Sequence, residues 1–232
     1  MKIHRFIGQF SEKGDRVFIN DEKIIHQIKN VLKLQPGEKI ILVFGAGREA
    51  VCQLEEINST FIVCHKQSEN KSSLDAGKRI ILYVSILKKD NFEVVTQKAT
   101  EVGATKIVPI ISARTIKKDV NMERLRRIAT EASEQSGRTV VPEISVPIDF
   151  AVAVDLAREN DVNYAFEKEM PEFDNVAVQK FKSVGLFIGP EGGWLPEELD
   201  KMKQNKFVFA GLGKNVLRAE TAAIVATFLT NK

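Results

Sequence analysis

A chain of 232 residues with 44% hydrophobic side chains can form one large domain or two modest ones, each with a buried core. Its 34 basic and 31 acidic side chains leave a net charge of +3, which does not demonstrate nucleic-acid binding but permits a local basic face. No run of apolar residues approaches the ~18 that a membrane span needs, and residues 1–5 lack an apolar signal core, so we expect a cytoplasmic protein without membrane contact.

Residues 1–68 are predicted to form a β-rich domain. A helix is expected over residues 21–34, with Asp21 as its cap, and short strands over 39–44, 49–57 and 60–65. The sequence GAGREA at 45–50 fits a dinucleotide-binding pattern. Because a strand and not a helix follows it, we expect a hairpin turn there. Residues 69–78 are polar and are predicted to be a linker.

Residues 79–232 show strands and helices in alternation. Strands are expected over 80–87, 106–110, 143–146, 162–166, 183–188 and 206–210, and helices over 91–102, 121–135, 149–160, from Pro196 and over 219–229. Alternation of this kind predicts an α/β fold with a mostly parallel sheet covered on both faces.

Metal and disulfide chemistry have little support in the sequence. Cys52 and Cys64 lie on predicted strands without C-x-x-C spacing, so we expect two buried thiols. The three histidines do not form a zinc pattern, and no metal is expected.

Two glycine-bearing segments follow predicted strands near the C-terminus. They are IGPEGGW at 188–194 and LGKNVLRAETA at 212–222. Glycine lets a backbone turn tightly and approach another molecule closely. We therefore expect two neighbouring strands to end in a pocket at the edge of the sheet. The first turn lacks the spacing of a phosphate-binding P-loop.

Five motifs in register resemble one known family. Besides the two glycine segments, these are KATEVG at 98–103, EQSGR at 134–138 and the N-terminal stretches HRF at 4–6 and 26–34. Together they resemble the bacterial 16S rRNA uridine-N3 methyltransferases, the RsmE group of the SPOUT superfamily, over nearly the whole chain. The chain departs from the family where VLK stands at 31–33 instead of V-L-R and ART at 113–115 instead of E-R-S. These departures concern RNA contacts, since lysine lacks the planar fork of arginine.

The resemblance implies a two-domain enzyme. Residues 79–232 would form a SPOUT methyltransferase domain with a deep trefoil knot, and residues 1–68 a PUA-like β-barrel that helps to hold RNA. The cofactor would be S-adenosylmethionine and the substrate one uridine of 16S rRNA in the small ribosomal subunit, methylated at N3 by a homodimer. The alternatives are another SPOUT enzyme, acting on tRNA or on a ribose 2′-hydroxyl, and a non-catalytic RNA-binding assembly factor.

Site residues are expected in three groups. The cofactor-binding set is Ile188, Gly189, Pro190, Glu191, Gly192, Leu212, Gly213, Val216, Leu217, Arg218 and Thr221. Arg218 is the expected catalytic group, because a guanidinium suits the two carbonyl oxygens of a uridine anion, while Glu220 accepts the proton or orders Arg218. The RNA-binding set is His4, Arg5, Lys29, Lys33, Arg114 and Arg138. Trp194 is expected to pack the following helix onto the sheet.

Overall fold

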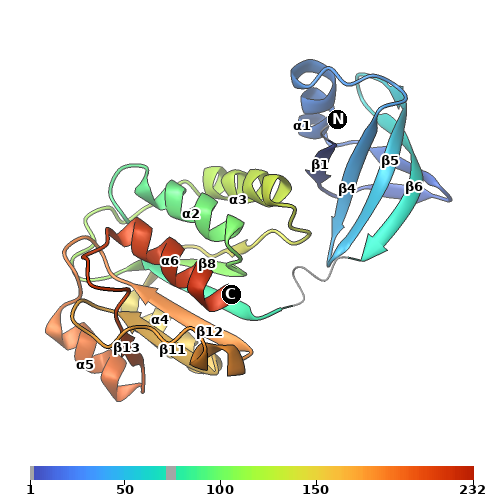
Figure 1. Cartoon of the computed structure of the whole chain (residues 1–232). Coiled ribbons are helices and arrows are strands. Elements are labelled where there is room, and N and C mark those ends of the chain that lie inside the picture. Colours follow the sequence, from blue (N-terminus) through green and yellow to red (C-terminus); the bar gives the residue numbers. More distant parts are fainter. Residues whose placement is uncertain (1–2, 72–76) are drawn as a thin grey trace. The chain divides into compact units, whose positions relative to one another are not determined.

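The computed structural model describes residues 3–71 and 77–232, which divide into two compact units. The first unit comprises residues 1–76 with 133–140, and the second comprises 77–132 with 141–232. Each has its own apolar core and is described separately (Figure 1).

The described secondary structure begins with the first unit's strands and helix. These are β1 (His4–Ile7), β2 (Ser11–Lys13), β3 (Arg16–Ile19), α1 (Glu22–His26) with a π-helical turn (Gln27–Val31), β4 (Lys39–Gly45), β5 (Arg48–Ile57) and β6 (Ile62–Lys71). The elements that follow are β7 (Arg79–Ser85), α2 (Asn91–Glu101), β8 (Lys106–Ile111), α3 (Met122–Ser136), β9 (Glu143–Ile144), β10 (Ile148–Asp149), α4 (Phe150–Leu156) with a 3₁₀ turn (Ala157–Glu159), β11 (Val162–Phe166), a 3₁₀ turn (Ala177–Lys180), β12 (Ser183–Ile188), α5 (Pro196–Gln204), β13 (Val208–Ala210) and α6 (Ala219–Asn231).

The first unit is a six-stranded sheet in the order β1-β4-β5-β6-β3-β2. Its inward side chains and α1 form one core around Phe6, Ile28 and Leu42, all fully buried. The GAGREA segment turns the chain between the antiparallel strands β4 and β5, so the predicted hairpin is confirmed. Three successive residues from Gly45 to Gly47 have positive φ, a conformation that a dinucleotide-binding helix start would not have.

Two predictions for this unit need correction. The helix expected over 21–34 is capped by Asp21 as predicted but changes to a π-helical turn after His26 and ends at Val31. The helix cannot continue because Lys33 adopts a left-handed φ of 52°. In addition, Gln35 precedes Pro36, and a residue before proline disfavours the helical conformation. The predicted linker is also too long, because residues 69–71 belong to β6, where they pair with β5; residues 72–76 lie outside the described part of the chain.

The second unit is a three-layer α/β domain. Its parallel sheet has the order β10-β8-β7-β12-β11-β13, with β9 beside β8. Helices α2, α3 and α6 cover one face of the sheet, and α4 and α5 cover the other (Figure 1). Side chains of β7 alternate between these faces: Ile80 and Leu82 join the core with α2, α3 and α6, whereas Ile81 joins the core with α4 and α5. The α/β class and the alternating elements are confirmed, although α4 ends at Leu156 and is shorter than expected.

The two cysteines provide a first test of the core of the N-terminal unit. Burial raises the pKa of the Cys52 thiol to about 11 and that of the Cys64 thiol to about 12. Both thiols therefore stay neutral at pH 8, and a neutral buried thiol is a poor nucleophile. We expect less than one equivalent of thiol to react with a disulfide reagent at pH 8 within an hour, and two after denaturation; rapid native reaction at both would contradict this packing.

Candidate active site

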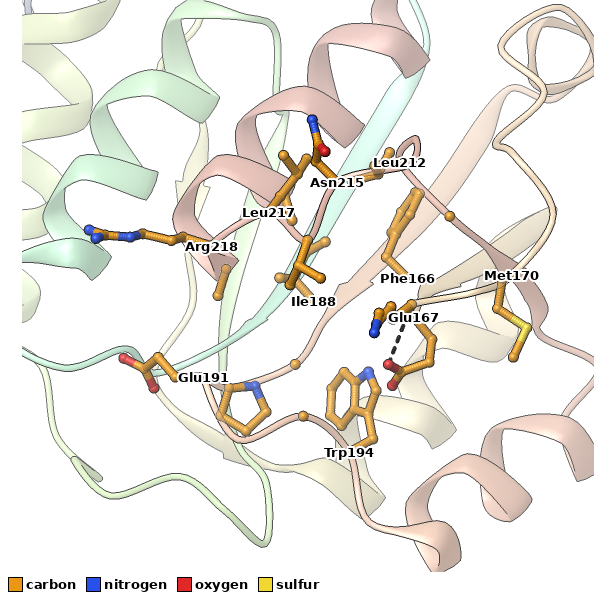
Figure 2. A pocket seen from close by; sticks show the side chains of 18 of the residues that line it. Phe166, Glu167, Met170, Ile188, Glu191, Trp194, Leu212, Asn215, Leu217 and Arg218 are labelled. Atoms are coloured by element: carbon orange, nitrogen blue, oxygen red, sulfur yellow. Dashed lines mark hydrogen bonds between the residues drawn. The ribbon is translucent and has the colours of Figure 1, made fainter.

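A cavity of about 950 Å³ lies where β11, β12 and β13 end at one edge of the sheet (Figure 2). Three loops line it, one after each strand, together with the start of α6 and Asn91 of α2. In parallel sheets, ligands bind at the carboxyl ends of the strands. The sequence predicts a pocket formed by two loops, and the structure adds a third loop, the one after β11.

The loop after β12 contributes the segment from Ile188 to Trp194. Gly193 closes a turn by donating its N–H to the Pro190 carbonyl over 2.8 Å, and its φ of 71° suits glycine. The indole of Trp194 packs between Gly189 and Phe150 of α4, with ring centroids 5.4 Å apart. Trp194 also belongs to the buried core that the sheet shares with α4 and with the following helix α5, as its expected packing role requires, and its ring lines the cavity as well.

The loop after β13 runs from Gly211 to Arg218. Gly211 donates to the Pro171 carbonyl over 2.7 Å and accepts from the Phe173 N–H over 2.9 Å, so this loop is joined to the loop after β11. Leu212 and Leu217 are half-buried, while the side chain of Val216 is 73% exposed. The loop ends at Arg218, which is the N-cap residue of α6 and has an extended backbone conformation.

The loop after β11 was missed by the sequence interpretation. Phe166, Glu167, Lys168, Glu169 and Met170 all line the cavity. The two glycine loops were expected on neighbouring strands, but β11 pairs with both β12 and β13 and lies between them. The signal was available, because residues 162–166 were a predicted strand of the same parallel sheet and its carboxyl end had to reach the same edge.

The turn after β8 is fixed next to the loop after β12. The buried carboxylate of Glu198 accepts from the Ala113 N–H over 2.9 Å and from the Leu195 N–H over 2.8 Å. A buried hydroxyl cluster of Ser85, Ser112 and Thr115 closes the turn from the other end. Arg114, held between them, donates to the Gly192 carbonyl. Arg114 therefore borders the site, although its guanidinium is partly used to hold the loop.

Most of the predicted cofactor and catalytic residues line the cavity. The predicted residues in its lining are Ile188, Gly189, Pro190, Glu191, Gly192, Leu212, Gly213, Val216, Leu217, Arg218 and Glu220. Thr221 is absent from the lining; it is the third residue of α6 and is exposed. Glu191 accepts from the backbone N–H of Lys88 over 3.0 Å, so its carboxylate anchors the loop after β7.

Arg218 lies on the open side of the cavity. Its side chain is exposed and, among the described residues, makes no hydrogen bond or ion pair. Figure 2 shows the guanidinium on the same side of the cavity as Glu191, away from Trp194 and Met170. An unpaired guanidinium at the mouth of an apolar cavity can receive carbonyl or anionic oxygens.

The predicted RNA-binding residues occupy different environments. Lys29 and Lys33 are exposed on the first unit and His4 is half-buried there. Arg5 forms an ion pair with Glu49, and Arg138 is only 7% exposed, so neither guanidinium is freely accessible from solvent. Exposed cations are the ones that phosphates can reach, and this favours Lys29 and Lys33 over Arg5 and Arg138.

The cavity combines apolar walls with accessible backbone, which suits a ligand that has both an apolar ring and polar groups. Ile188, Leu212 and Leu217 form apolar walls, and the glycines at 189, 192 and 213 leave backbone accessible. In the described part of the chain, no group of three His, Cys, Asp or Glu side chains could hold a metal ion. No helix within that part is long and apolar enough to cross a membrane.

Comparison with known proteins agrees with this geometry. Residues 75–231 match the model of an RNA methyltransferase domain, and residues 19–66 match that of an RNA methyltransferase PUA domain. The ribosomal RNA small subunit methyltransferase E of Rickettsia conorii is 30% identical over 97% of this chain and 94% of its own. That of Bacillus subtilis is 29% identical over 87% of this chain and 84% of its own.

Solved structures show the same fold. A ribosomal RNA small subunit methyltransferase E from Neisseria gonorrhoeae, bound to S-adenosylmethionine, has a TM-score of 0.87 at 27% identity, covering 97% of this chain and 95% of its own. A methyltransferase from Legionella pneumophila, also in complex with that cofactor, has a TM-score of 0.86 at 27% identity over 98% and 96% of the two chains. By its two domain models and its full-length relatives, this chain belongs to the RNA methyltransferase family of the ribosomal RNA small subunit methyltransferases E.

Proposed function

We propose that the protein transfers a methyl group from S-adenosylmethionine to N3 of one uridine in the 16S rRNA of the small ribosomal subunit. The observation that carries the proposal is the cavity between the three loops, with an unpaired arginine at its mouth. Family membership supports the reaction, because the full-length relatives are named ribosomal RNA small subunit methyltransferase E. Two solved relatives also bind S-adenosylmethionine.

The cofactor-binding residues are proposed to be the ten predicted ones that line the cavity, with Arg218 contributing its backbone and leaving its side chain for the acceptor. The other nine are Ile188, Gly189, Pro190, Glu191, Gly192, Leu212, Gly213, Val216 and Leu217. The apolar walls would hold the adenine, and the glycine backbone would approach the ribose without a Cβ in the way. We leave Thr221 out of this set because it does not line the cavity. When bound, the cofactor supplies an activated methyl group to the acceptor.

The acceptor nitrogen limits the reaction. Uridine N3 carries a proton and is about as weak an acid as a phenol, with a pKa of about 10. Arg218 would stabilise the anion by donating hydrogen bonds to a carbonyl oxygen beside N3. Glu220 lines the same cavity two residues further along the chain and would accept the proton or orient Arg218.

RNA would be held by cations outside the cavity. We propose that Lys29, Lys33 and His4 contact phosphates from the N-terminal PUA-type domain, with Arg114 beside the target nucleotide. Arg5 and Arg138 would support these surfaces through their contacts within the protein. The domain limits proposed are residues 1–71 for RNA binding and residues from Arg79 onward for catalysis.

Three further properties are part of the proposal. The loops after β11, β12 and β13 would form the trefoil knot, as the joining of Gly211 to residues 171–173 suggests. The enzyme would act as a homodimer, consistent with the exposed Val216 and Phe228 at either end of the α6 region. A ribosomal substrate implies a cytoplasmic location.

Nucleoside mass spectrometry of 16S rRNA tests the reaction. Purified protein and S-adenosylmethionine would be incubated with small subunits from a strain that lacks the corresponding enzyme, and with free rRNA in parallel. We expect N3-methyluridine at one site in the subunits. A different methylated nucleoside would overturn the substrate, and cofactor binding without rRNA methylation would indicate tRNA or another acceptor. Absence of both binding and methylation would favour a non-catalytic assembly factor.

A further inference from the structure

We propose that Trp194 and Glu167 form a donor–acceptor pair that binds the ribose hydroxyls of the cofactor. This inference rests on the proposed function, since it assigns a part of the same cavity. It concerns two residues that the sequence interpretation did not place in the site, one in the loop after β12 and one in the loop after β11.

Trp194 presents a buried donor without an acceptor. Its side chain is 4% exposed, and the indole Nε1–H is the buried side-chain polar atom that has no hydrogen-bond partner among the described residues. A buried donor left unpaired is costly, and such groups in native proteins call for an explanation. Because Trp194 lines the cavity, a bound ligand can supply the missing acceptor.

The position of the indole is fixed from two sides. Phe150 packs against the ring at a centroid distance of 5.4 Å, and a Cβ at Gly189 would lie only 3.1 Å from the ring. The ring therefore cannot easily turn away from the cavity to find water. A donor held in place before binding loses little entropy when the ligand arrives.

Glu167 supplies acceptors in the same part of the cavity. Its backbone N–H donates to the Ala210 carbonyl over 3.1 Å, which fixes it between β11 and β13. One carboxylate oxygen accepts from the Lys168 N–H over 2.9 Å, and a carboxylate has further acceptor sites. Figure 2 shows the indole nitrogen and this carboxylate facing the same side of the cavity, away from Arg218.

Neighbouring hydroxyls match this pair. Each hydroxyl both donates and accepts, so one can accept from the Trp194 indole while the other donates to the Glu167 carboxylate. Glu191, the acidic residue of the predicted cofactor-binding set, already accepts a hydrogen bond from the Lys88 N–H. The cofactor's ribose is favoured over that of the target nucleotide, because Trp194 is buried whereas Arg218, the proposed partner of the uracil, lies at the exposed mouth.

Calorimetric titration with S-adenosylhomocysteine and its 2′-deoxy and 3′-deoxy analogues tests the pair. We expect Trp194→Phe to weaken binding of the full ligand about tenfold and Glu167→Gln about fivefold. Each loss should nearly vanish for the analogue that lacks the hydroxyl in question. Glu197→Gln is the matched control, since it removes the same charge from an exposed site of α5 outside the cavity.

The outcomes separate this inference from the proposed function. Failure of the wild-type protein to bind the ligand would overturn the proposed function itself. Wild-type binding with equal losses for the full and the deoxy ligands would overturn the pair, because it would reduce Trp194 to a packing role. Unchanged ligand affinity with a raised KM for small subunits would also overturn it, since the residues would then serve the RNA. Circular dichroism confirms that each variant is folded.

Discussion

Turnover of the Arg218→Ala variant is expected to fall about 10²–10³-fold while its affinity for S-adenosylhomocysteine stays within about threefold. Removing one donor that stabilises developing negative charge has an effect of this size in other enzymes. Affinity should persist because Arg218 lies at the exposed mouth, whereas the apolar walls and glycine backbone form the deeper cavity. Single-turnover methylation of small subunits and calorimetric titration measure the two quantities.

The pH dependence distinguishes stabilisation of the uridine anion from RNA placement. Below a pKa of about 10, the fraction of N3 anion rises tenfold for each pH unit. A guanidinium at the carbonyl oxygen lowers the pKa of the bound uridine, so the wild-type rate should level off at a lower pH than the variant rate. The ratio of the two rates is therefore expected to shrink between pH 7 and 9.5. A constant ratio would mean that Arg218 only positions the RNA.

Two further variants complete this test. Arg218→Lys keeps the positive charge but loses the planar fork, so we expect it to recover only part of the activity. Arg158→Ala removes a guanidinium that pairs with Asp155 on the exposed end of α4, outside the cavity, and should leave the rate unchanged. Normal turnover of Arg218→Ala would remove Arg218 from the mechanism.

The sequence predicts the second unit better than the first. Strands such as β7 and β12 are largely apolar runs that are buried after their first residue, and the helices between them have clear apolar faces, so local pattern and fold agree. Strands β1 and β3 have four residues each and β2 is exposed throughout, so their short sequences carry little periodicity. Their pairing depends on distant partners such as β4 and β6, which local pattern cannot reveal.

The sequence predicts the parts of the candidate site that are formed by glycine-containing loops. It does not predict the parts that depend on the order of strands in the sheet. The glycines at 189, 192 and 213 mark loops that line the cavity, and their spacing is visible in the sequence. The insertion of β11 between β12 and β13 is a property of topology, and it brings Glu167 and Met170 into the site. The unpaired nitrogen of Trp194 is likewise visible only once its neighbours are known.

Gly211→Ala is expected to abolish measurable cofactor binding and to destabilise the second unit. A Cβ at this position would lie 2.7 Å from the Met170 carbonyl oxygen, and that oxygen is backbone, which cannot swing aside like a side chain. The loops after β11 and β13 would have to separate, at the expense of the hydrogen bonds between Gly211 and residues 171 and 173. We estimate a loss of about 2–4 kcal/mol in the free energy of unfolding.

Thermal unfolding with and without S-adenosylhomocysteine measures both effects. The melting temperature should fall by roughly 6–12 °C, and the ligand should raise it little, since stabilisation by a ligand depends on its affinity for the folded state. Gly77→Ala is the matched control, because its added Cβ would have no atom within 4 Å and its φ is not positive. It should behave as wild type.

Gly213→Ala separates crowding from backbone conformation in the same loop. Nothing lies within 4 Å of a Cβ at Gly213, but its φ of 103° is unfavourable for alanine. We expect a loss of about 1–2 kcal/mol without separation of the loops, and therefore weakened but measurable ligand binding. If Gly211→Ala instead matched wild type in melting temperature and affinity, the two loops would not be held together as tightly as their hydrogen bonds indicate. The cavity would then take its shape only when the ligand binds, because the contact between the two loops would not hold them in place beforehand.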